Sequence, residues 1–170
     1  MWDSGKTDMI WDDSFKKLRY LPEPITGFQA EEWKRQGYTH DTTYGKMYGG
    51  KDPVPKWVHE VAENIGLTNC GFVFYRMDFM DIMPVHQDHY AKYCEIFGKE
   101  YEDVYRAVVF LDEWQSGHYF EIDGQGAVNW ERGEYVIWKG SVPHSASNIG
   151  NKPRYTLQIT GTKIAGRHQD

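Results

Sequence analysis

The sequence predicts a mostly β protein, a sandwich or jelly-roll barrel with flanking helices, in which N-terminal helices buttress the barrel core. After residue 70, short segments rich in β-branched and aromatic residues recur, and glycines separate them at turn-like intervals. Before it, proline and glycine break the chain into short pieces around one clear helical pattern. We therefore expect a single domain over 1–170, with helical and irregular support over 1–69 and the barrel core over 70–165.

Length and composition agree with one folded domain. The chain has 170 residues, of which 40% are hydrophobic and 16% aromatic, and aromatic side chains bury large areas each. The formal net charge is −6, and no run of Lys or Arg stands out. Nucleic acid is therefore not an expected partner.

Cysteine use and hydropathy indicate the cellular setting. Cys70 and Cys94 lack CxxC spacing, so neither a structural zinc site nor a disulfide framework is expected, although one bridge between them stays open. The first residues lack the pattern of a signal peptide, and no apolar stretch approaches the roughly 18 residues that span a bilayer. We expect a cytoplasmic protein without a membrane partner.

One helix is predicted between Asp52 and Gly66. Asp52 suits the N-cap, Pro53 the first turn, and Gly66 the end. Between them, apolar residues recur at helical spacing: Val54, Trp57, Val58, Val61 and Ile65. This apolar face is expected to pack against a sheet.

The strands follow in the second part of the chain. Their predicted positions are 72–75, 107–111, 135–138 and 155–159. Between 92 and 103 the strand character is weak. There we expect an insertion that is partly helical.

Two histidines and a carboxylate form a candidate metal site. His86 and Asp88 would share one face of a strand, because side chains alternate along it. This triplet arises easily by chance, so a solvated strand end is the simpler interpretation when it stands alone. His144 follows another apolar strand and, alone, fits a buried histidine bonded to backbone equally well. Together they match the two-histidine, one-carboxylate triad of non-haem iron(II) oxygenases.

The last predicted strand opens with Arg154. Alternation puts one set of residues on one face, namely Arg154, Thr156, Gln158 and Thr160, and a second set on the other, namely Tyr155, Leu157 and Ile159. The first face suits a polar barrel interior, and the second an exterior covered by helices. The guanidinium can bind a carboxylate with two hydrogen bonds, and a hydroxyl two residues on can donate to the same group. A surface arginine on an edge strand would explain Arg154 alone, but not its coincidence with both metal motifs.

With these residues, the stretch from Cys70 to Gly161 resembles the iron(II)- and 2-oxoglutarate-dependent dioxygenase superfamily, especially its prolyl-hydroxylase-like branch. The matching elements are His86-x-Asp88, His144, Arg154-x-Thr156, and the segment Ser116–Phe120, which is similar to the Gly-Gly-x-Phe strand of that branch. The resemblance covers a little over half of the chain. It implies a double-stranded β-helix, which is a jelly roll.

The resemblance also implies a role for each matching residue. Iron(II) would be bound by His86, Asp88 and His144. The distal carboxylate of 2-oxoglutarate would be anchored by Arg154, with Thr156 assisting and Tyr75 touching the same group. The implied reaction uses O2 and hydroxylates an unactivated carbon, releasing succinate and carbon dioxide.

Two departures from the branch concern cosubstrate and substrate. Phe110 stands where relatives often have a tyrosine that binds the cosubstrate, so this contact is expected to be absent. The insertion after Asp88 is longer than in compact relatives, and its aromatic residues are expected to line the substrate entrance: His89, Tyr90, Tyr93 and Tyr101. Tyr119 and Arg106 are candidate substrate contacts, with packing and surface pairing as the alternatives. The expected substrate is a peptide residue such as proline, a free amino acid or another small molecule.

Two other functions use the same residues. A cupin-like metalloenzyme that does not use 2-oxoglutarate would keep the triad, but Arg154 would then have no carboxylate to bind. A non-catalytic jelly-roll module would bind a structural metal or none, since a fold does not fix a function.

Overall fold

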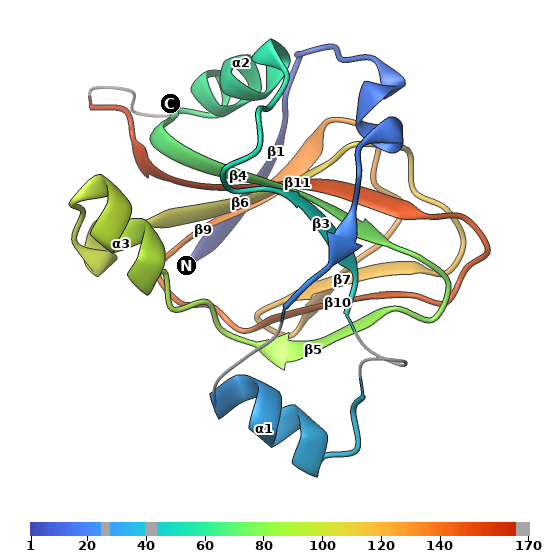
Figure 1. Ribbon diagram of the computed structural model, residues 1–170. Coiled ribbons are helices and arrows are strands. Elements are labelled where there is room, and N and C mark those ends of the chain that lie inside the picture. Colours follow the sequence, from blue (N-terminus) through green and yellow to red (C-terminus); the bar gives the residue numbers. More distant parts are fainter. Residues whose placement is uncertain (25–27, 40–43, 166–170) are drawn as a thin grey trace.

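Two antiparallel sheets face each other across the centre of the molecule in the computed structural model, which describes residues 1–24, 28–39 and 44–165 (Figure 1). The larger sheet has seven strands, in the order β1 (Trp2–Lys6), β9 (Glu134–Lys139), β6 (Tyr105–Phe110), β11 (Arg154–Lys163), β4 (Leu67–Met77), β3 (Lys46–Gly49) and β2 (Leu21–Pro22). The smaller sheet has four, in the order β5 (Ile82–His86), β10 (His144–Asn148), β7 (His118–Ile122) and β8 (Gln125–Ala127). The mostly β, jelly-roll fold class is confirmed.

The four predicted strands are confirmed as parts of β4, β6, β9 and β11, although β4 and β11 are longer than predicted and Leu111 lies one residue beyond β6. The first part of the chain, for which we expected helices and irregular segments, also supplies strands. β1 pairs with β9 and β3 pairs with β4, so N-terminal residues extend the larger sheet on both sides.

Within the part of the chain that the structure describes, three α-helices and two 3-10 helices accompany the sheets. They are α1 (Phe28–Arg35), α2 (Lys56–Asn64), α3 (Ala91–Phe97), η1 (Asp13–Lys17) and η2 (Tyr101–Asp103). Figure 1 shows α2 over the outer face of the larger sheet and α1 beyond β5. α3 and η2 occupy the region 92–103, so the expected partly helical insertion is confirmed. Within the described ranges, no helix combines the length and apolarity needed to cross a membrane.

The predicted helix between Asp52 and Gly66 begins later than expected. It starts at Lys56, because Pro55 disfavours a helical conformation at the residue before it. Asp52 therefore does not cap the helix, and its carboxylate instead accepts the N–H of Gly49 at 3.4 Å. The predicted end is confirmed, since Gly66 follows the helix with φ +81°, a conformation that glycine adopts without strain.

The two faces of β11 are both buried, but against different surroundings. The outward residues Leu157 and Ile159 belong to one core cluster with Val58 and Val61 of α2, which confirms the predicted exterior. On the inward face lie Arg154, Thr156, Gln158 and Thr160. A second apolar cluster fills the space between the sheets, with Val108, Phe110, Phe120, Ile122, Val136 and Trp138 among its members. Polar inward side chains are therefore held within an apolar barrel.

A candidate metal centre

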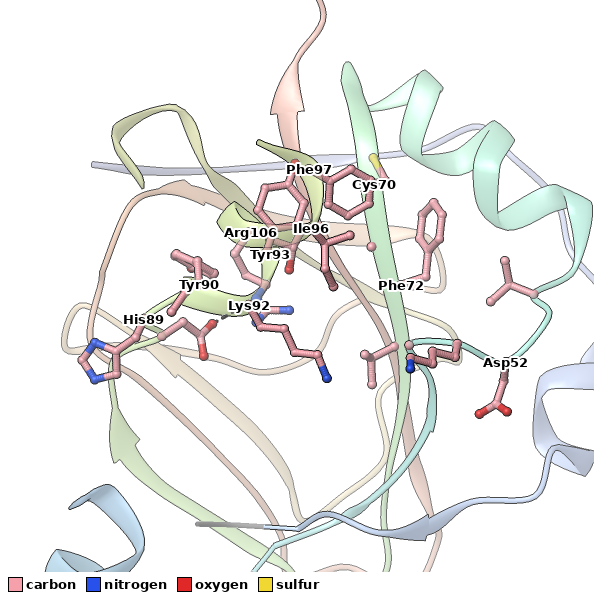
Figure 2. A pocket seen from close by; sticks show the side chains of 18 of the residues that line it. Asp52, Cys70, Phe72, His89, Tyr90, Lys92, Tyr93, Ile96, Phe97 and Arg106 are labelled. Carbon is pink, nitrogen blue, oxygen red and sulfur yellow. Dashed lines mark hydrogen bonds and ion pairs between the residues drawn. The ribbon is translucent and has the colours of Figure 1, made fainter. Parts of the chain in front are cut away.

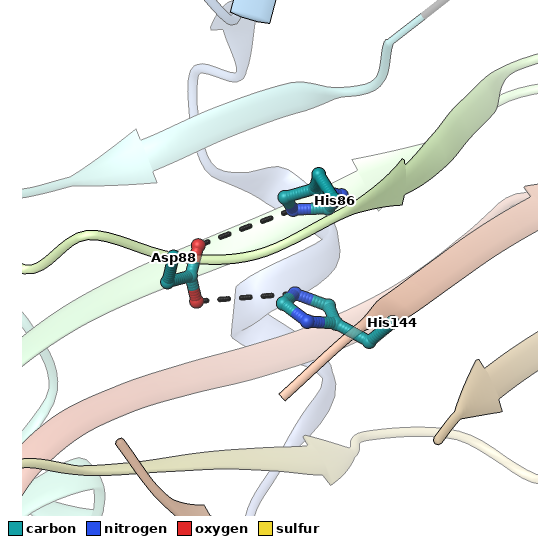
Figure 3. A group of neighbouring side chains, drawn as sticks. All are labelled: His86, Asp88 and His144. Atoms are coloured by element: carbon teal, nitrogen blue, oxygen red, sulfur yellow. Dashed lines mark ion pairs between the residues drawn. The ribbon is translucent and has the colours of Figure 1, made fainter. Parts of the chain in front are cut away.

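The antiparallel pairing of β5 and β10 brings the two histidines together. His86 ends β5, His144 begins β10, and the two residues are direct partners in the strand register. Asp88 follows two residues after His86. One donor atom from each side chain lies within 4.8 Å of the others (Figure 3). The chain therefore brings two imidazoles and one carboxylate together where the end of β5 lies beside the start of β10.

Backbone carbonyls fix the orientation of both imidazole rings. Nδ1 of His86 lies 2.8 Å from the carbonyl oxygen of Pro84, and Nδ1 of His144 lies 2.9 Å from that of Val142. A carbonyl oxygen only accepts, so each Nδ1 carries the proton and donates it. In the neutral form of a ring held this way, Nε2 carries the free lone pair that binds a metal ion.

The two Nε2 atoms point at the same carboxylate. His86 Nε2 lies 3.9 Å from Oδ1 of Asp88, and His144 Nε2 lies 3.8 Å from Oδ2 (Figure 3). Burial lowers the pKa of His144 to about 4, and the neighbouring His86 acts in the same direction. The His144 ring is therefore neutral at pH 7, as a metal ligand must be.

Asp88 is kept ionised by its partners. Burial pushes its pKa upward, but the guanidinium of Arg106 and the two imidazoles outweigh burial, and the pKa lies below its ordinary value. Arg106 Nε donates to Asp88 Oδ2 at 2.9 Å, and its guanidinium lies 5.5 Å from the ring centre of Tyr90. The structure shows Arg106 holding the carboxylate of Asp88, and its expected contact with substrate stays a prediction.

Arg154 lies deeper in the barrel, surrounded by aromatic rings. Its guanidinium carbon is 5.5 to 5.8 Å from the ring centres of Phe110, Phe120 and Trp130. Nη1 donates to the sulfur of Met77 at 3.4 Å, while Nε and Nη2 are buried without a hydrogen-bond partner among the described residues. Burial lowers the pKa of Arg154 to about 10. The side chain is thus a buried cation with free donors.

Phe120 connects the two parts of the site. Its ring centre lies 6.4 Å from that of His144 and 5.7 Å from the Arg154 guanidinium. Thr156 is buried on the same face of β11 as Arg154 and pairs in register with Tyr75 of β4. The barrel interior therefore holds the metal-ligand group and the free cation around one aromatic ring.

Tyr75 is engaged by the N-terminal part of the chain. Its hydroxyl donates to Glu23 Oε2 at 2.5 Å and accepts the N–H of Gly45 at 3.0 Å. Burial raises the pKa of Glu23, while the hydrogen bond from Tyr75 and the nearby His86 act against that rise. The Glu23 carboxylate is thus a neighbour of the metal-ligand group.

Trp33 of α1 is a second N-terminal contribution to the site. Its ring meets that of His86 edge-on, with centres 5.6 Å apart, and it is nearly fully buried. We did not predict a role for Glu23 or Trp33. Neither residue has a spacing to the histidine motifs that would single it out. The amphipathic pattern around Trp33 indicates burial but not the partner.

Tyr119 lies away from this site. Residues alternate along β7, so the inward position of Phe120 directs Tyr119 to the opposite face, where its hydroxyl donates to Glu121 at 2.9 Å. The expected substrate contact of Tyr119 is therefore replaced by a hydrogen bond on the outer surface.

A cleft of about 970 Å³ lies beside the metal-ligand group, of which Asp88 is a lining residue (Figure 2). Arg106 and Thr160 of β11 line it as well. Of the aromatic residues in the insertion, His89, Tyr90 and Tyr93 line the cleft, whereas Tyr101 packs on Tyr90 with ring centres 5.8 Å apart. The insertion thus forms one wall of the route to Asp88.

The sequence matches no protein-family model and no curated protein. Solved structures do match. A Pseudomonas putida prolyl-4-hydroxylase is similar over 96% of this chain and 93% of its own, with a TM-score of 0.56 and 14% identity. A Thermotoga maritima protein described as a predicted oxalate decarboxylase is similar over 85% and 94%, with a TM-score of 0.45 and 13% identity. At these identities the likeness concerns the fold, and the chain has the double-stranded β-helix architecture.

Proposed function

We propose that this protein is an iron(II)- and 2-oxoglutarate-dependent dioxygenase. The observation that carries the proposal is Arg154, a buried cation with two free donor nitrogens, Nε and Nη2, in the same barrel as His86, Asp88 and His144. A charge buried without a counterion is costly, so a protein that keeps one has a use for it. An anionic ligand inside the barrel is such a use.

The donor set suits iron(II). Two imidazoles and one carboxylate leave several coordination positions open, which is the ligand set of non-haem iron(II) oxygenases. His86, Asp88 and His144 would hold the ion, and their donor atoms already point toward one another. Arg106 would keep Asp88 oriented and ionised.

The cation suits a carboxylate. The Arg154 guanidinium presents free donors in a fixed plane, which match the two oxygens of a carboxylate. Thr156 lies two residues along the same face and can add a hydroxyl, while the rings of Phe110, Phe120 and Trp130 exclude water around the pair. 2-Oxoglutarate has the required distal carboxylate, and its keto-acid end would lie toward the metal.

When bound, iron and 2-oxoglutarate would supply the activation of O2, with succinate and carbon dioxide as products and hydroxylation of an unactivated carbon as the reaction. The chain's own residues position these groups and shield them. The substrate would enter through the cleft that ends at Asp88. Peptide residues, free amino acids and other small molecules are the substrate classes to be compared.

An anaerobic titration with iron(II) and 2-oxoglutarate tests the proposal without a substrate. We expect the weak visible charge-transfer band of the chelated complex in the wild-type protein. The band should disappear in His144→Ala and need far more 2-oxoglutarate in Arg154→Met. Arg132→Met is the matched control, because Arg132 also lies over aromatic rings, those of Trp11 and Phe15, but outside the barrel. Bound iron with no band in the wild type would overturn the 2-oxoglutarate assignment and favour a cupin-like metalloenzyme.

A further inference from the structure

The cleft that leads to Asp88 has two kinds of wall. One is apolar and aromatic, formed by Phe72 of β4 and by residues of the insertion, namely Tyr90, Tyr93, Ile96 and Phe97 (Figure 2). Ile96 keeps 62% of its surface exposed, although it is a large apolar side chain. An exposed apolar wall within a cleft indicates an apolar ligand.

The second kind of wall is cationic. Lys92 of α3 and Lys51 of the loop between β3 and α2 line the cleft, and neither forms an ion pair with any described residue. Figure 2 shows the Lys92 side chain extending into the space between α3 and the loop that carries Asp52. In a chain with a net charge of −6, these two ammonium groups outnumber the one unpaired carboxylate of the cleft, that of Asp52.

Two carboxylates also line the cleft. Asp88 pairs with Arg106, whereas Asp52 accepts the N–H of Gly49 and keeps its negative charge. The two lysines therefore leave one net positive charge for a ligand.

We propose that the cleft binds a small organic acid, an apolar body that carries one anionic group. The anion would lie between Lys51 and Lys92, and the apolar body would run along Tyr93 and Ile96 toward Asp88. A volume of about 970 Å³ is in the range of small-molecule sites. If the protein also has the proposed dioxygenase function, one further consequence follows. The carbon that is oxidised would belong to the apolar part of the ligand, remote from the anion.

Binding of matched probes to the metal-free protein tests the inference independently of turnover. The probes are octanoate, octyl sulfate, octanamide and octylammonium, compared by isothermal titration calorimetry. We expect both anions to bind at least about tenfold more tightly than the amide, and octylammonium to bind most weakly. The ratio of octanoate to octyl sulfate distinguishes a carboxylate site from a general anion site.

Three variants locate the contacts. Lys51→Gln with Lys92→Gln should reduce the preference for the anions to about twofold or less, and 500 mM salt should have a similar effect on the wild type. Ile96→Gln, at an exposed position that does not hold the fold, should weaken all four probes alike. Lys17→Gln is the matched control, an exposed lysine outside the cleft.

The outcomes separate this inference from the proposed function. Equal affinity for octanoate and octanamide, or an anion preference that survives the double lysine change, would overturn the organic-acid site even if the charge-transfer band is present. A clear anion preference in a protein that forms no such band would support the site and reject the 2-oxoglutarate chemistry.

Discussion

Two arginines inside the barrel differ in one respect, the presence of a counterion. Arg106, near the open cleft, donates to Asp88 at 2.9 Å, and Asp88 raises the pKa of Arg106 against the opposing effect of burial. Arg154, at the aromatic end, has no carboxylate partner among the described residues, and burial lowers its pKa to about 10.

This difference indicates that Arg106 stabilises the folded protein, whereas Arg154 is available to bind a ligand. Arg106 compensates the buried charge of Asp88, so it contributes to the stability of the folded protein. Arg154 is held by cation–π contacts and a sulfur atom, which orient it but leave two donors free. Changing each arginine to methionine should therefore affect different quantities.

Arg154→Met should have the largest effect, and that effect should be on ligand affinity. We expect 2-oxoglutarate to bind about 100- to 1,000-fold more weakly, the cost of losing one partner of a buried charged pair. The free energy of unfolding should stay the same or rise by about 1 kcal/mol, because an uncompensated buried charge is removed. Titration of the charge-transfer band and denaturant unfolding measure the two quantities. Unchanged affinity would show that Arg154 does not anchor the cosubstrate.

Arg106→Met should instead destabilise the metal-free protein. Leaving Asp88 without its counterion should cost roughly 2–3 kcal/mol, less than for a fully buried pair, because the two side chains keep 16% and 20% of their surface exposed. A divalent metal ion should restore most of this loss, since it becomes the counterion of Asp88. Thermal unfolding with and without zinc(II) measures both effects.

The double variant Arg106→Met/Asp88→Leu is the control for this prediction. It should recover stability relative to Arg106→Met, because no uncompensated charge remains. A loss below about 0.5 kcal/mol in Arg106→Met would contradict the idea that the pair stabilises the site.

A pH series measures how strongly burial lowers the pKa of His144. The pKa of His144 is about 4 in the folded protein and about 6.5 when unfolded, so only the unfolded state takes up this proton between these values. Stability of the metal-free protein should therefore fall by about 2 kcal/mol from pH 6.5 to pH 5.

His144→Leu isolates this contribution. The pKa of His118 is also lowered by burial and acts in the same direction in both proteins, so the informative quantity is the difference between their slopes. Parallel pH profiles would mean that His144 is protonated as readily in the folded protein as in the unfolded one. The measurement is urea unfolding at each pH.

Much of the fold and part of the site could be predicted from sequence. Strand alternation placed Arg154 and Thr156 on the inward face of β11 and Leu157 on the face covered by α2, because a period of two depends only on local geometry. His86 and Asp88 are only two residues apart, so their proximity in space follows from the sequence, although Asp88 lies beyond the end of β5 and not on the strand as expected. These predictions needed no knowledge of which strands are neighbours.

The remaining features depend on contacts between distant parts of the chain. Trp130 reaches Arg154 from a loop between β8 and β9, and Arg106 of β6 meets Asp88, which follows β5 of the other sheet, because the two sheets face each other. The contributions of Glu23 and Trp33 likewise require the path of the N-terminal segment around the barrel. No residue spacing encodes such partners. The sequence therefore identified the two arginines but not the side chains that surround them.

The smallest effect concerns Tyr75, which lies between the aromatic end of the barrel and the N-terminal segment. Its hydroxyl has one proton and donates it to Glu23, so a carboxylate of 2-oxoglutarate would compete with Glu23 for that bond. Glu23→Gln should strengthen 2-oxoglutarate binding about threefold, and Tyr75→Phe should weaken it about threefold, the size of one ordinary hydrogen bond.

The double variant decides whether the two residues act through this bond. If they do, Glu23→Gln should have no effect once Tyr75 is phenylalanine, and the double variant should bind 2-oxoglutarate like Tyr75→Phe alone. Packing is preserved because phenylalanine fills the same buried space. Additive effects would mean that Glu23 acts on the metal-ligand group directly, through His86, rather than through Tyr75.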